Sequence, residues 1–240
     1  MNSDEQKRAV AAAAVDWLHE RLPRDAILGV GTGTTADHFI DLLAPLRERF
    51  AGAVASSSRS AERLARHGVR IVDLNDVDRL PFYVDGADEI NGDLAMTKGG
   101  GGALTREKIV AAAADVFVCI ADAQKRVDRL GRFPLPIEVL PMARAQVVRA
   151  LGRLAGDLRL GEPSFSVRTT TDGAPLVTDN GNCIVDVRGW TIAEPRTVEA
   201  AIDGIVGVVE CGLFALRPAD VLLVPDGGRV ATVVRPRPAA

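Results

Sequence analysis

The sequence predicts an α/β fold, in which helices cover a mostly parallel sheet and a smaller α+β domain is inserted into the larger one. Over residues 1–130, short apolar runs alternate with segments whose apolar residues recur at helical spacing. After Gly131 this alternation stops at the proline-punctuated stretch Phe133–Pro141, and two apolar runs near the C-terminus resume it. Strands that alternate with helices pair in parallel and are buried on both faces, so we expect helices on both sides of the main sheet.

The chain outside residues 131–210 predicts the elements of a Rossmann-like domain. Residues 4–21 carry apolar side chains at helical spacing up to Pro23, which predicts the first helix. The apolar run Ala26–Val30 predicts the first strand, and a helix with Phe39 and Leu43 on one face follows it. Further strands are predicted over Gly52–Ala55, Arg70–Asp73, Phe82–Asp85, Val116–Ile120, Val221–Val224 and Arg229–Val234, and helices over Ser60–Gly68 and Leu104–Ala114.

Residues 131–210 predict a strand–helix–strand–strand–helix–strand order, which is the split βαβ, or ferredoxin-like, pattern. The predicted segments are Phe133–Pro141, Ala143–Leu154, Ser164–Arg168, Ile184–Val187, Thr197–Ile202 and Gly207–Glu210. We therefore expect an inserted α+β lid or dimerisation domain at residues 131–210. The Rossmann-like catalytic domain is expected to comprise residues 1–130 and 211–240, with a tail that frays from Pro236.

Composition and charge exclude several classes of protein. The 29 basic and 32 acidic residues among 240 give a net charge of −3, without a basic stripe that would predict nucleic-acid binding. No apolar run reaches the roughly 18 residues of a membrane span, and residues 1–8 are too polar for a secretory signal. The three cysteines and three histidines lack the spacing of metal ligands or of a disulfide framework. We expect a cytoplasmic protein with buried thiols, and no metal, membrane or nucleic acid as its partner.

The segment from Lys98 to Lys108 reads Lys-Gly-Gly-Gly-Gly-Ala-Leu-Thr-Arg-Glu-Lys and is the most informative in the chain. Four successive glycines cost backbone entropy, and they persist where the chain approaches a ligand closely or needs positive φ. Their amides, beside a helix N-terminus, form an anion-binding concavity. The cation of Lys98 and the carboxylate of Glu107 are what proton abstraction next to a carbonyl requires. The alternative is a flexible linker followed by a capped helix.

Two other strand ends carry polar loops, and ligands bind outside the carboxyl ends of parallel strands. The loop Gly31–Ala36 fits the G-x-G-x-x-A dinucleotide fingerprint, but serines before Arg59 replace the acid expected about 20 residues on. Its glycines and threonines suit a phosphate monoester equally well, and a tight turn without a ligand is the alternative.

The stretch Val84–Ile90 places three carboxylates close together, which indicates proton transfer, hydroxyl binding or a metal site. The alternative is an acidic turn capped by Asp88. Since no histidine is near and Lys98 is, sugar-hydroxyl binding outranks a metal.

Two further segments have weaker signals. Lys125 follows the predicted strand Val116–Ile120, so its ammonium either reaches an anionic substrate or belongs to a solvated loop. The turn Thr178–Asn182 contains the Asn-Gly pair of a hairpin and needs no further role.

Four ordered stretches carry a specific pattern: Gly29–Ile40, Tyr83–Asn91, Lys98–Lys108 and Phe133–Arg144. Together they closely resemble ribose-5-phosphate isomerase, type A. The resemblance covers nearly the whole chain and includes Val177–Asn182 and Gly212–Phe214. Two departures are small. Thr34 stands where the family commonly has Ser and keeps the hydroxyl, whereas Gly102 stands where Ala is frequent and should only loosen the loop.

The resemblance implies a cofactor-free aldose–ketose isomerase of the non-oxidative pentose phosphate pathway, which interconverts ribose 5-phosphate and ribulose 5-phosphate as a homodimer or higher homo-oligomer. It implies that Glu107 carries the proton between C2 and C1 of an enediolate, whose oxygen Lys98 stabilises. Asp85 and Asp88 are expected to bind sugar hydroxyls and assist ring opening. The other residues expected to bind substrate are Thr32, Gly33, Thr34, Thr35, Gly86, Ala87, Gly99, Gly100, Gly101 and Lys125.

The residues by themselves leave two other functions open. An NADP-dependent oxidoreductase would use the loop Gly31–Ala36 and Arg59, but it gives Asp85, Asp88 and Glu107 no role. A sugar-phosphate-sensing module would need an appended DNA-binding domain, and residues 1–25 offer a single helix.

Overall fold

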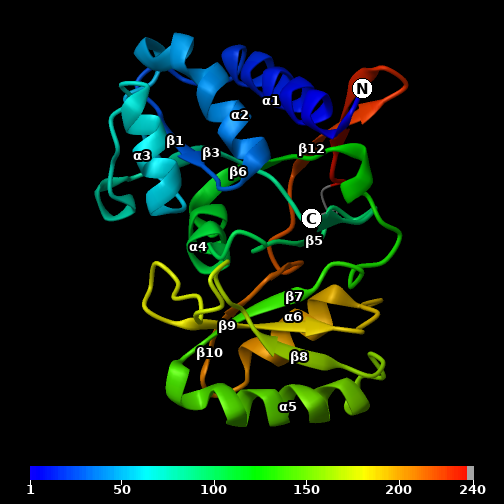
Figure 1. The fold of residues 1–240 in the computed structure, drawn as a ribbon. Coiled ribbons are helices and arrows are strands. Elements are labelled where there is room, and N and C mark those ends of the chain that lie inside the picture. Colours follow the sequence, from blue (N-terminus) through cyan, green and yellow to red (C-terminus); the bar gives the residue numbers. More distant parts are fainter. Residues whose placement is uncertain (237–240) are drawn as a thin grey trace. The chain divides into compact units, whose positions relative to one another are not determined.

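A computed structural model of the chain describes residues 1–236, which form two compact units (Figure 1). The first unit comprises Met1–Ala87, Arg106–Arg126 and the chain from Pro218, and the second comprises Asp88–Thr105 and Val127–Arg217. The predicted domain boundaries at residues 131 and 210 stay a prediction, and the second unit also takes in residues 88–105. The expectation of a frayed tail falls on residues outside the described ones, apart from Pro236 itself.

The first unit contains a mostly parallel sheet. Its strands are β1 (Ile27–Val30), β2 (Gly52–Ala55), β3 (Leu80–Asp85), β6 (Ala114–Ile120), β12 (Val221–Asp226) and β13 (Arg229–Val234). They lie in the order β13-β12-β6-β3-β1-β2, and neighbours are parallel except β13, which runs antiparallel to β12. The predicted α/β fold with a mostly parallel sheet is therefore confirmed.

Helices cover both faces of this sheet. They are α1 (Ser3–His19), α2 (Thr34–Leu43), α3 (Ser58–Arg66) and α4 (Leu104–Ala113). On one face, Leu28 and Val30 of β1 share a hydrophobic core with α1, α2 and α3. On the other face, a Cβ at residue 29 would lie 2.9 Å from Cδ2 of Tyr83 and 3.0 Å from Cγ1 of Val110 in α4. Gly29 therefore allows α4 to pack closely against the sheet.

The strand predicted over Arg70–Asp73 is wrong. Ile71 makes an isolated parallel bridge to Ala53, and Asp73 caps a 3-10 helix, η2 (Leu74–Asp76), by accepting the N–H of Asn75 at 2.8 Å. The aspartate side chain offers the backbone a local partner that competes with strand pairing. The other 3-10 helices of the described chain are η1 (Ala44–Arg49), η3 (Ala123–Lys125) and η4 (Pro141–Ala143).

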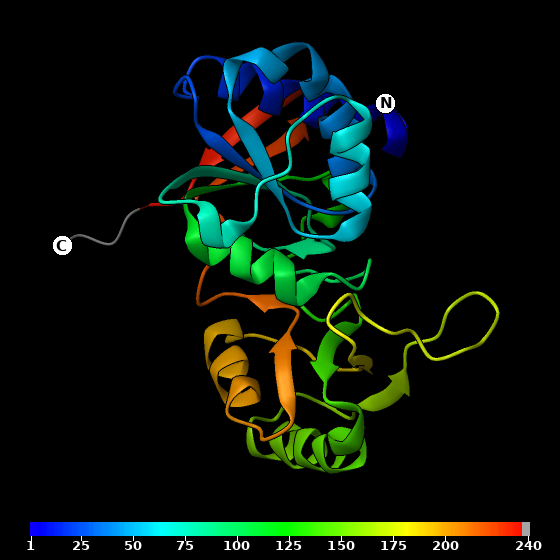
Figure 2. The same ribbon diagram turned by 90° about the vertical axis from the view of Figure 1, so that its left-hand side faces the viewer.

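The second unit contains an antiparallel sheet with two helices on one face (Figure 2). Its elements are β7 (Leu135–Val139), α5 (Arg144–Asp157), β8 (Ser164–Val167), β9 (Cys183–Arg188), α6 (Pro195–Asp203) and β10 (Val208–Cys211). The strand order β10-β7-β9-β8 is that of the predicted ferredoxin-like pattern. Apolar side chains at alternate positions of β7 and β9, such as Ile137 and Val185, face the helices. The residues between them, among them Glu138 and Asp186, face the other way.

A small antiparallel sheet in the second unit was not predicted. It consists of β4 (Glu89–Ile90), β5 (Met96–Thr97) and β11 (Leu213–Phe214), in the order β11-β5-β4. Strands of two residues have too short a pattern to be seen in a sequence, and their pairing depends on the rest of the unit. Among residues 1–236, no helix is long and apolar enough to span a membrane.

Candidate active site

The carboxylate of Asp85 lies at the end of β3 and is fully buried. It accepts the backbone N–H of Thr32 at 3.0 Å and that of Gly86 at 2.7 Å, and the hydroxyl of Tyr83 also donates to it. A Cβ at residue 31 would lie 1.9 Å from the carboxyl carbon, so Gly31 is needed for this approach. These donors satisfy a buried carboxylate that would otherwise be costly to bury.

Tyr83 is a permanent donor in this group. Burial raises the pKa of its phenol well above the ordinary value of 10.0, and the negative charges of Asp85 and Glu107 raise that pKa further. The phenol therefore keeps its proton at neutral pH and continues to donate to Asp85.

This raised pKa predicts how stability changes at alkaline pH. The unfolded chain loses the tyrosine proton first, so the contribution of Tyr83 to the free energy of unfolding should be constant below about pH 10 and fall above it. Because Tyr83 is the single tyrosine of the chain, tyrosinate absorbance reports on this residue alone. We expect that absorbance to appear only as the protein unfolds, and Tyr83→Phe to remove the corresponding loss of stability. Tyrosinate formed in folded protein near pH 10 would contradict the prediction.

Thr32, a predicted phosphate ligand, is tied into a cluster of hydroxyl groups. Its own hydroxyl lies 2.8 Å from those of Ser56 and Ser57 and 3.3 Å from that of Ser60. The Ser60 hydroxyl donates to the backbone carbonyl of Gly31 at 2.7 Å. The serines that replace the acid of the dinucleotide fingerprint thus connect the loop after β2 to the loop after β1. Sequence reasoning noted these serines as a departure and missed this role.

Gly33 precedes α2, and Thr34 and Thr35 are the first two residues of this helix, whose first amides have no acceptor within the helix. Gly33 has φ of +112°, and a Cβ there would meet no atom within 4 Å. Thr34 is exposed and Thr35 is half-buried. Free space, hydroxyl groups and the positive end of the helix dipole suit a phosphate, so phosphate binding stays a prediction that this geometry accommodates.

Arg59, on which the dinucleotide alternative depends, is engaged elsewhere. Its guanidinium donates to the carboxylate of Asp37 in α2. Because Arg59 pairs with Asp37, its guanidinium is not available to bind a nucleotide, as the NADP-dependent oxidoreductase alternative requires.

Glu107 lies in the first turn of α4 and is buried, with 3% of its surface exposed. Lys125 ends η3, after β6, and is half-buried, as are Gly86 and Ala87. The Glu107 carboxylate is largely shielded from water and follows the glycine loop in the sequence, and such surroundings suit a general base.

In the second unit the glycine loop begins at Lys98, which directly follows β5 and is buried with 3% of its surface exposed. The Lys98 Nζ lies 5.5 Å from the ring centroid of Phe214. The Lys98 N–H donates to the carbonyl of Gly212 at 2.8 Å, and a Cβ at residue 212 would lie 2.4 Å from the Lys98 carbonyl oxygen. Asp88 accepts the N–H of Gly100 at 2.7 Å.

Several of the glycines are required by this conformation. Gly99 and Gly102 have φ of +103° and +83°, which side chains rarely tolerate. A Cβ at residue 100 would lie 2.7 Å from Oδ1 of Asp88. Gly100 and Gly101 are exposed, so their backbone is open to a ligand. The loop is therefore a shaped turn and differs from the flexible linker of the alternative interpretation.

An arginine that sequence reasoning missed contacts this loop. Arg168, directly after β8, donates through Nη1 to the carbonyl oxygens of Gly99 at 2.6 Å and Gly100 at 3.1 Å. It also pairs with Asp186 of β9 through Nε, at 2.9 Å, and through Nη2. In the sequence Arg168 stands next to a run of threonines and carries no motif that would have revealed it.

A second missed residue, Glu138 of β7, is fully buried. Its carboxylate accepts the hydroxyl of Thr178 at 2.8 Å, the amide of Asn182 at 2.8 Å and the amide of Asn180 at 3.1 Å. The hydroxyl of Thr105, which follows the glycine loop, donates to it too. The Thr178–Asn182 turn therefore has a role beyond that of a hairpin, because its polar side chains and Thr105 share one buried acceptor.

Glu89, the third carboxylate of the crowded stretch Val84–Ile90, is anchored by backbone groups. It accepts the N–H of Gly131 at 2.8 Å and that of Phe133 at 2.7 Å. The side chain thus fixes the loop that leads into β7.

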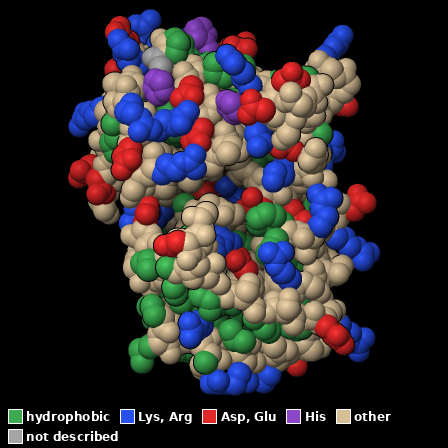
Figure 3. All heavy atoms as spheres, viewed as in Figure 1, with side chains coloured by type: hydrophobic (Ala, Val, Ile, Leu, Met, Phe, Trp, Pro, Cys, Tyr) green, Lys and Arg blue, Asp and Glu red, His purple; other side chains and the backbone are tan. Residues whose placement is uncertain are grey.

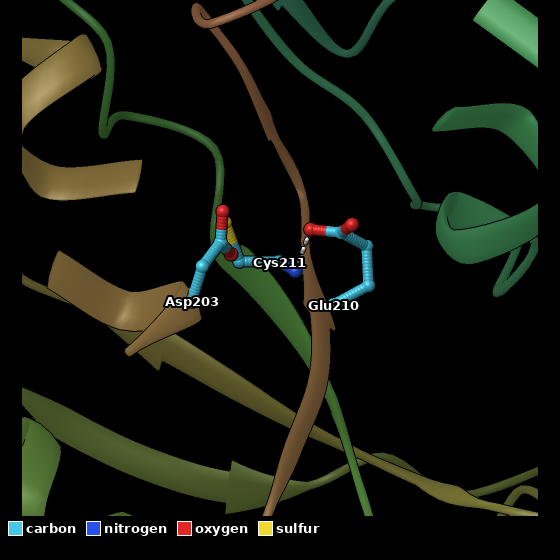
Figure 4. Close-up of side chains that lie close together, drawn as sticks. All are labelled: Asp203, Glu210 and Cys211. Carbon is cyan, nitrogen blue, oxygen red and sulfur yellow. Dashed lines mark hydrogen bonds between the residues drawn. The ribbon is translucent and has the colours of Figure 1, made fainter. Parts of the chain in front are cut away.

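Among residues 1–236, one group of side chains has potential ligand atoms close enough together to hold a metal. Oxygens of Asp203 and Glu210 and the Sγ of Cys211 lie within 4.8 Å of one another (Figure 4). A Glu210 oxygen accepts the N–H of Cys211 at 2.8 Å, and Asp203 is exposed. Proximity of three such groups does not define a site, and we assign no metal to them.

On the face of the first unit seen in Figure 3, acidic and basic side chains are interspersed. With a net charge of −3, the whole surface gives little attraction to an anion. An anionic substrate would therefore be recognised by local groups at the strand ends.

The predicted residues fall into two groups. The first unit holds Thr32–Thr35, Asp85–Ala87, Glu107 and Lys125, and the second holds Asp88 and Lys98–Gly101. Direct hydrogen bonds join Thr32 to Asp85 in the first and Gly100 to Asp88 in the second.

Comparison with known proteins gives consistent matches. The model of the family described as ribose 5-phosphate isomerase A (phosphoriboisomerase A) matches residues 52–228. The crystal structure of ribose 5 phosphate isomerase A from Neisseria gonorrhoeae is 42% identical with a TM-score of 0.87, over 98% of this chain and 99% of that chain. The enzyme from Methanocaldococcus jannaschii is 33% identical with a TM-score of 0.84, over 95% of this chain and 97% of that one. A D-ribose-5-phosphate isomerase in complex with phospho-erythronic acid is 33% identical with a TM-score of 0.86, over 98% of this chain and 100% of that one. The similarity extends over both units.

Proposed function

The chain belongs to the ribose 5-phosphate isomerase A family and interconverts D-ribose 5-phosphate and D-ribulose 5-phosphate, and we propose that it does so through an enediolate with Glu107 as the proton carrier. The observation that carries the proposal is the burial of Glu107 in the first turn of α4, directly after the glycine loop. The carboxylate removes the proton from C2 of the open-chain aldose. The C–H electrons form the C1=C2 bond, and the carbonyl electrons move to O1.

The same carboxylate completes the reaction. Glu107 returns its proton to C1, and the proton of the C2 hydroxyl passes to O1, so that C2 becomes the carbonyl and O1 the hydroxyl of the ketose. One base is enough because a carboxylate on one side of the planar enediolate can reach both C1 and C2. Lys98 and the amides of Gly99–Gly101 stabilise the oxygen on which negative charge develops.

Other residues bind and open the sugar. Asp85 and Asp88 accept hydrogen bonds from sugar hydroxyls and assist ring opening. The loop Thr32–Thr35 holds the phosphate, and Lys125 contacts the substrate. Within the loop, Thr34 and Thr35 have the more accessible hydroxyls, because the Thr32 hydroxyl is hydrogen-bonded to serines.

The reaction needs no metal, because Lys98 and the loop amides supply the positive potential that a metal would otherwise provide. Purified protein mixed with ribose 5-phosphate in excess EDTA should form ketose at the full rate. Glu107→Gln protein is the control for ketose formed without the enzyme. Loss of activity in EDTA that Mg²⁺ or Mn²⁺ restores would overturn the metal-free reaction and would point to the carboxylates Asp85 and Asp88 as ligands.

We also propose that the enzyme is cytoplasmic and forms a homodimer or higher homo-oligomer. Cys119, Cys183 and Cys211 form no disulfide in the described chain, as expected in a reducing compartment. Ile71 and Ile109 are exposed, and they border a hollow of about 450 Å³ on the first unit that a second copy would cover. Light scattering on protein eluting from a size-exclusion column measures the mass of the particle in solution. A monomer at micromolar concentration would exclude the oligomer.

A further inference from the structure

The peptide group between Gly99 and Gly100 is held at both ends. Its carbonyl oxygen accepts Nη1 of Arg168 at 2.6 Å, and its N–H donates to Asp88 at 2.7 Å. In a trans peptide the C=O and N–H bonds point in opposite directions, and the described chain has no cis peptide. The peptide plane therefore cannot rotate without the loss of one of these bonds.

Arg168 also fixes the next peptide group. Its Nη1 lies 3.1 Å from the carbonyl oxygen of Gly100, so the N–H of Gly101 points away from the guanidinium. In the described part of the chain, that N–H has no hydrogen-bond acceptor, and Gly101 is exposed. The second peptide thus presents a fixed donor to whatever binds at the loop.

Arg168 is itself immobilised. Its side chain is 14% exposed, and the side chain of its partner Asp186 is 12% exposed. The backbone N–H of Arg168 donates to the carbonyl of Ile184 at 2.9 Å, and its carbonyl accepts the N–H of Leu176 at 2.9 Å. Arg168 thus stands at the base of the loop that projects from the unit between β8 and β9 (Figure 2). All three guanidinium nitrogens are used in a planar fork that a lysine ammonium cannot reproduce.

We propose that Arg168 is a positioning residue for the isomerisation: it orients the glycine-loop peptides so that the N–H of Gly101 faces the oxygen on which charge develops. This inference rests on the proposed function. A donor fixed in advance stabilises the transition state more than the bound substrate, because the charge it meets is largest there. Loss of the hydrogen bonds from Arg168 to the glycine loop should therefore lower kcat and leave KM little changed.

The test compares two replacements of Arg168 in the full chain. Arg168→Lys keeps the cation beside Asp186 but loses the fork, and we expect kcat to fall by about tenfold. Arg168→Met removes both, and we expect a fall of about 10²-fold, the scale for misplacement of a catalytic group by about 1 Å. Arg168→Met leaves Asp186 unpaired and can unfold the protein, so Arg168→Lys is the deciding variant. Arg63→Lys is the matched control, because Arg63 forms a similar fork with Asp41, at 2.9 and 2.6 Å, between α3 and α2.

Binding of two anions separates positioning from a structural role. Phospho-erythronic acid, which a similar isomerase binds, carries a carboxylate that resembles the charged oxygens of an enediolate. Inorganic phosphate carries only the group assigned to the loop Thr32–Thr35. We expect Arg168→Lys to raise the Kd of phospho-erythronic acid by the same factor by which kcat/KM falls. The Kd of inorganic phosphate should stay unchanged.

The outcomes are distinct. Wild-type protein that does not isomerise ribose 5-phosphate would refute the proposed function. Active wild-type protein with an equally active Arg168→Lys variant would refute the positioning role alone. A variant that loses affinity for both anions, or loses activity in step with its melting temperature, would make Arg168 a structural residue and would also overturn the inference.

Discussion

Replacement of Glu107 by glutamine should lower kcat for the isomerisation by about 10²- to 10⁴-fold, which is the range for a general base. Glutamine keeps the shape and the hydrogen bonding of the side chain but cannot accept a carbon-bound proton. Since Glu107 is buried in the first turn of α4, nearby water cannot easily replace it. The measurement is ketose formation from ribose 5-phosphate, together with the Kd of phospho-erythronic acid, which should change much less.

Glu62→Gln is the matched control for this variant, because Glu62 is exposed on α3 and outside the predicted site. It should keep full activity. A Glu107→Gln enzyme that retained more than about a tenth of the wild-type kcat would require another residue to be the base.

Removal of the Lys98 side chain should have the second largest effect. We expect Lys98→Ala to lower kcat and kcat/KM together by about 10²- to 10³-fold, because the ammonium is needed when the enediolate charge forms. Lys98 is buried and lies over the ring of Phe214, so alanine also leaves a small cavity.

Lys98→Met separates charge from packing, because methionine fills much of the same space without the cation. We expect Lys98→Met to be as inactive as Lys98→Ala and more stable to heat. Recovery of activity in Lys98→Met would show that packing matters and charge does not. A rise in KM alone would make Lys98 a phosphate ligand.

The order of elements and the loops that carry the predicted chemistry could be read from the sequence. Apolar periodicity is a local property, so it located α1, α4 and the strands of the two larger sheets to within a few residues. Ligand loops of parallel sheets follow the carboxyl ends of strands, which is why Asp85 and the Gly31–Ala36 loop could be placed. The Arg70–Asp73 strand failed because the side chain of Asp73 bonds the backbone locally.

The sequence by itself therefore determined the fold class, the family resemblance and the segments expected to bind substrate. Tertiary structure alone decided which side chains support those segments. Arg168 donates a hydrogen bond to the carbonyl of Gly99, which lies 69 residues away in the sequence. Glu138 accepts hydrogen bonds from Thr178 and Asn182, which lie 40 and 44 residues away. The acceptors in the first case are backbone carbonyls, which every residue has, and no side-chain pattern marks them. Such bonds form only when strand pairing in β7, β8 and β9 has brought the partners together.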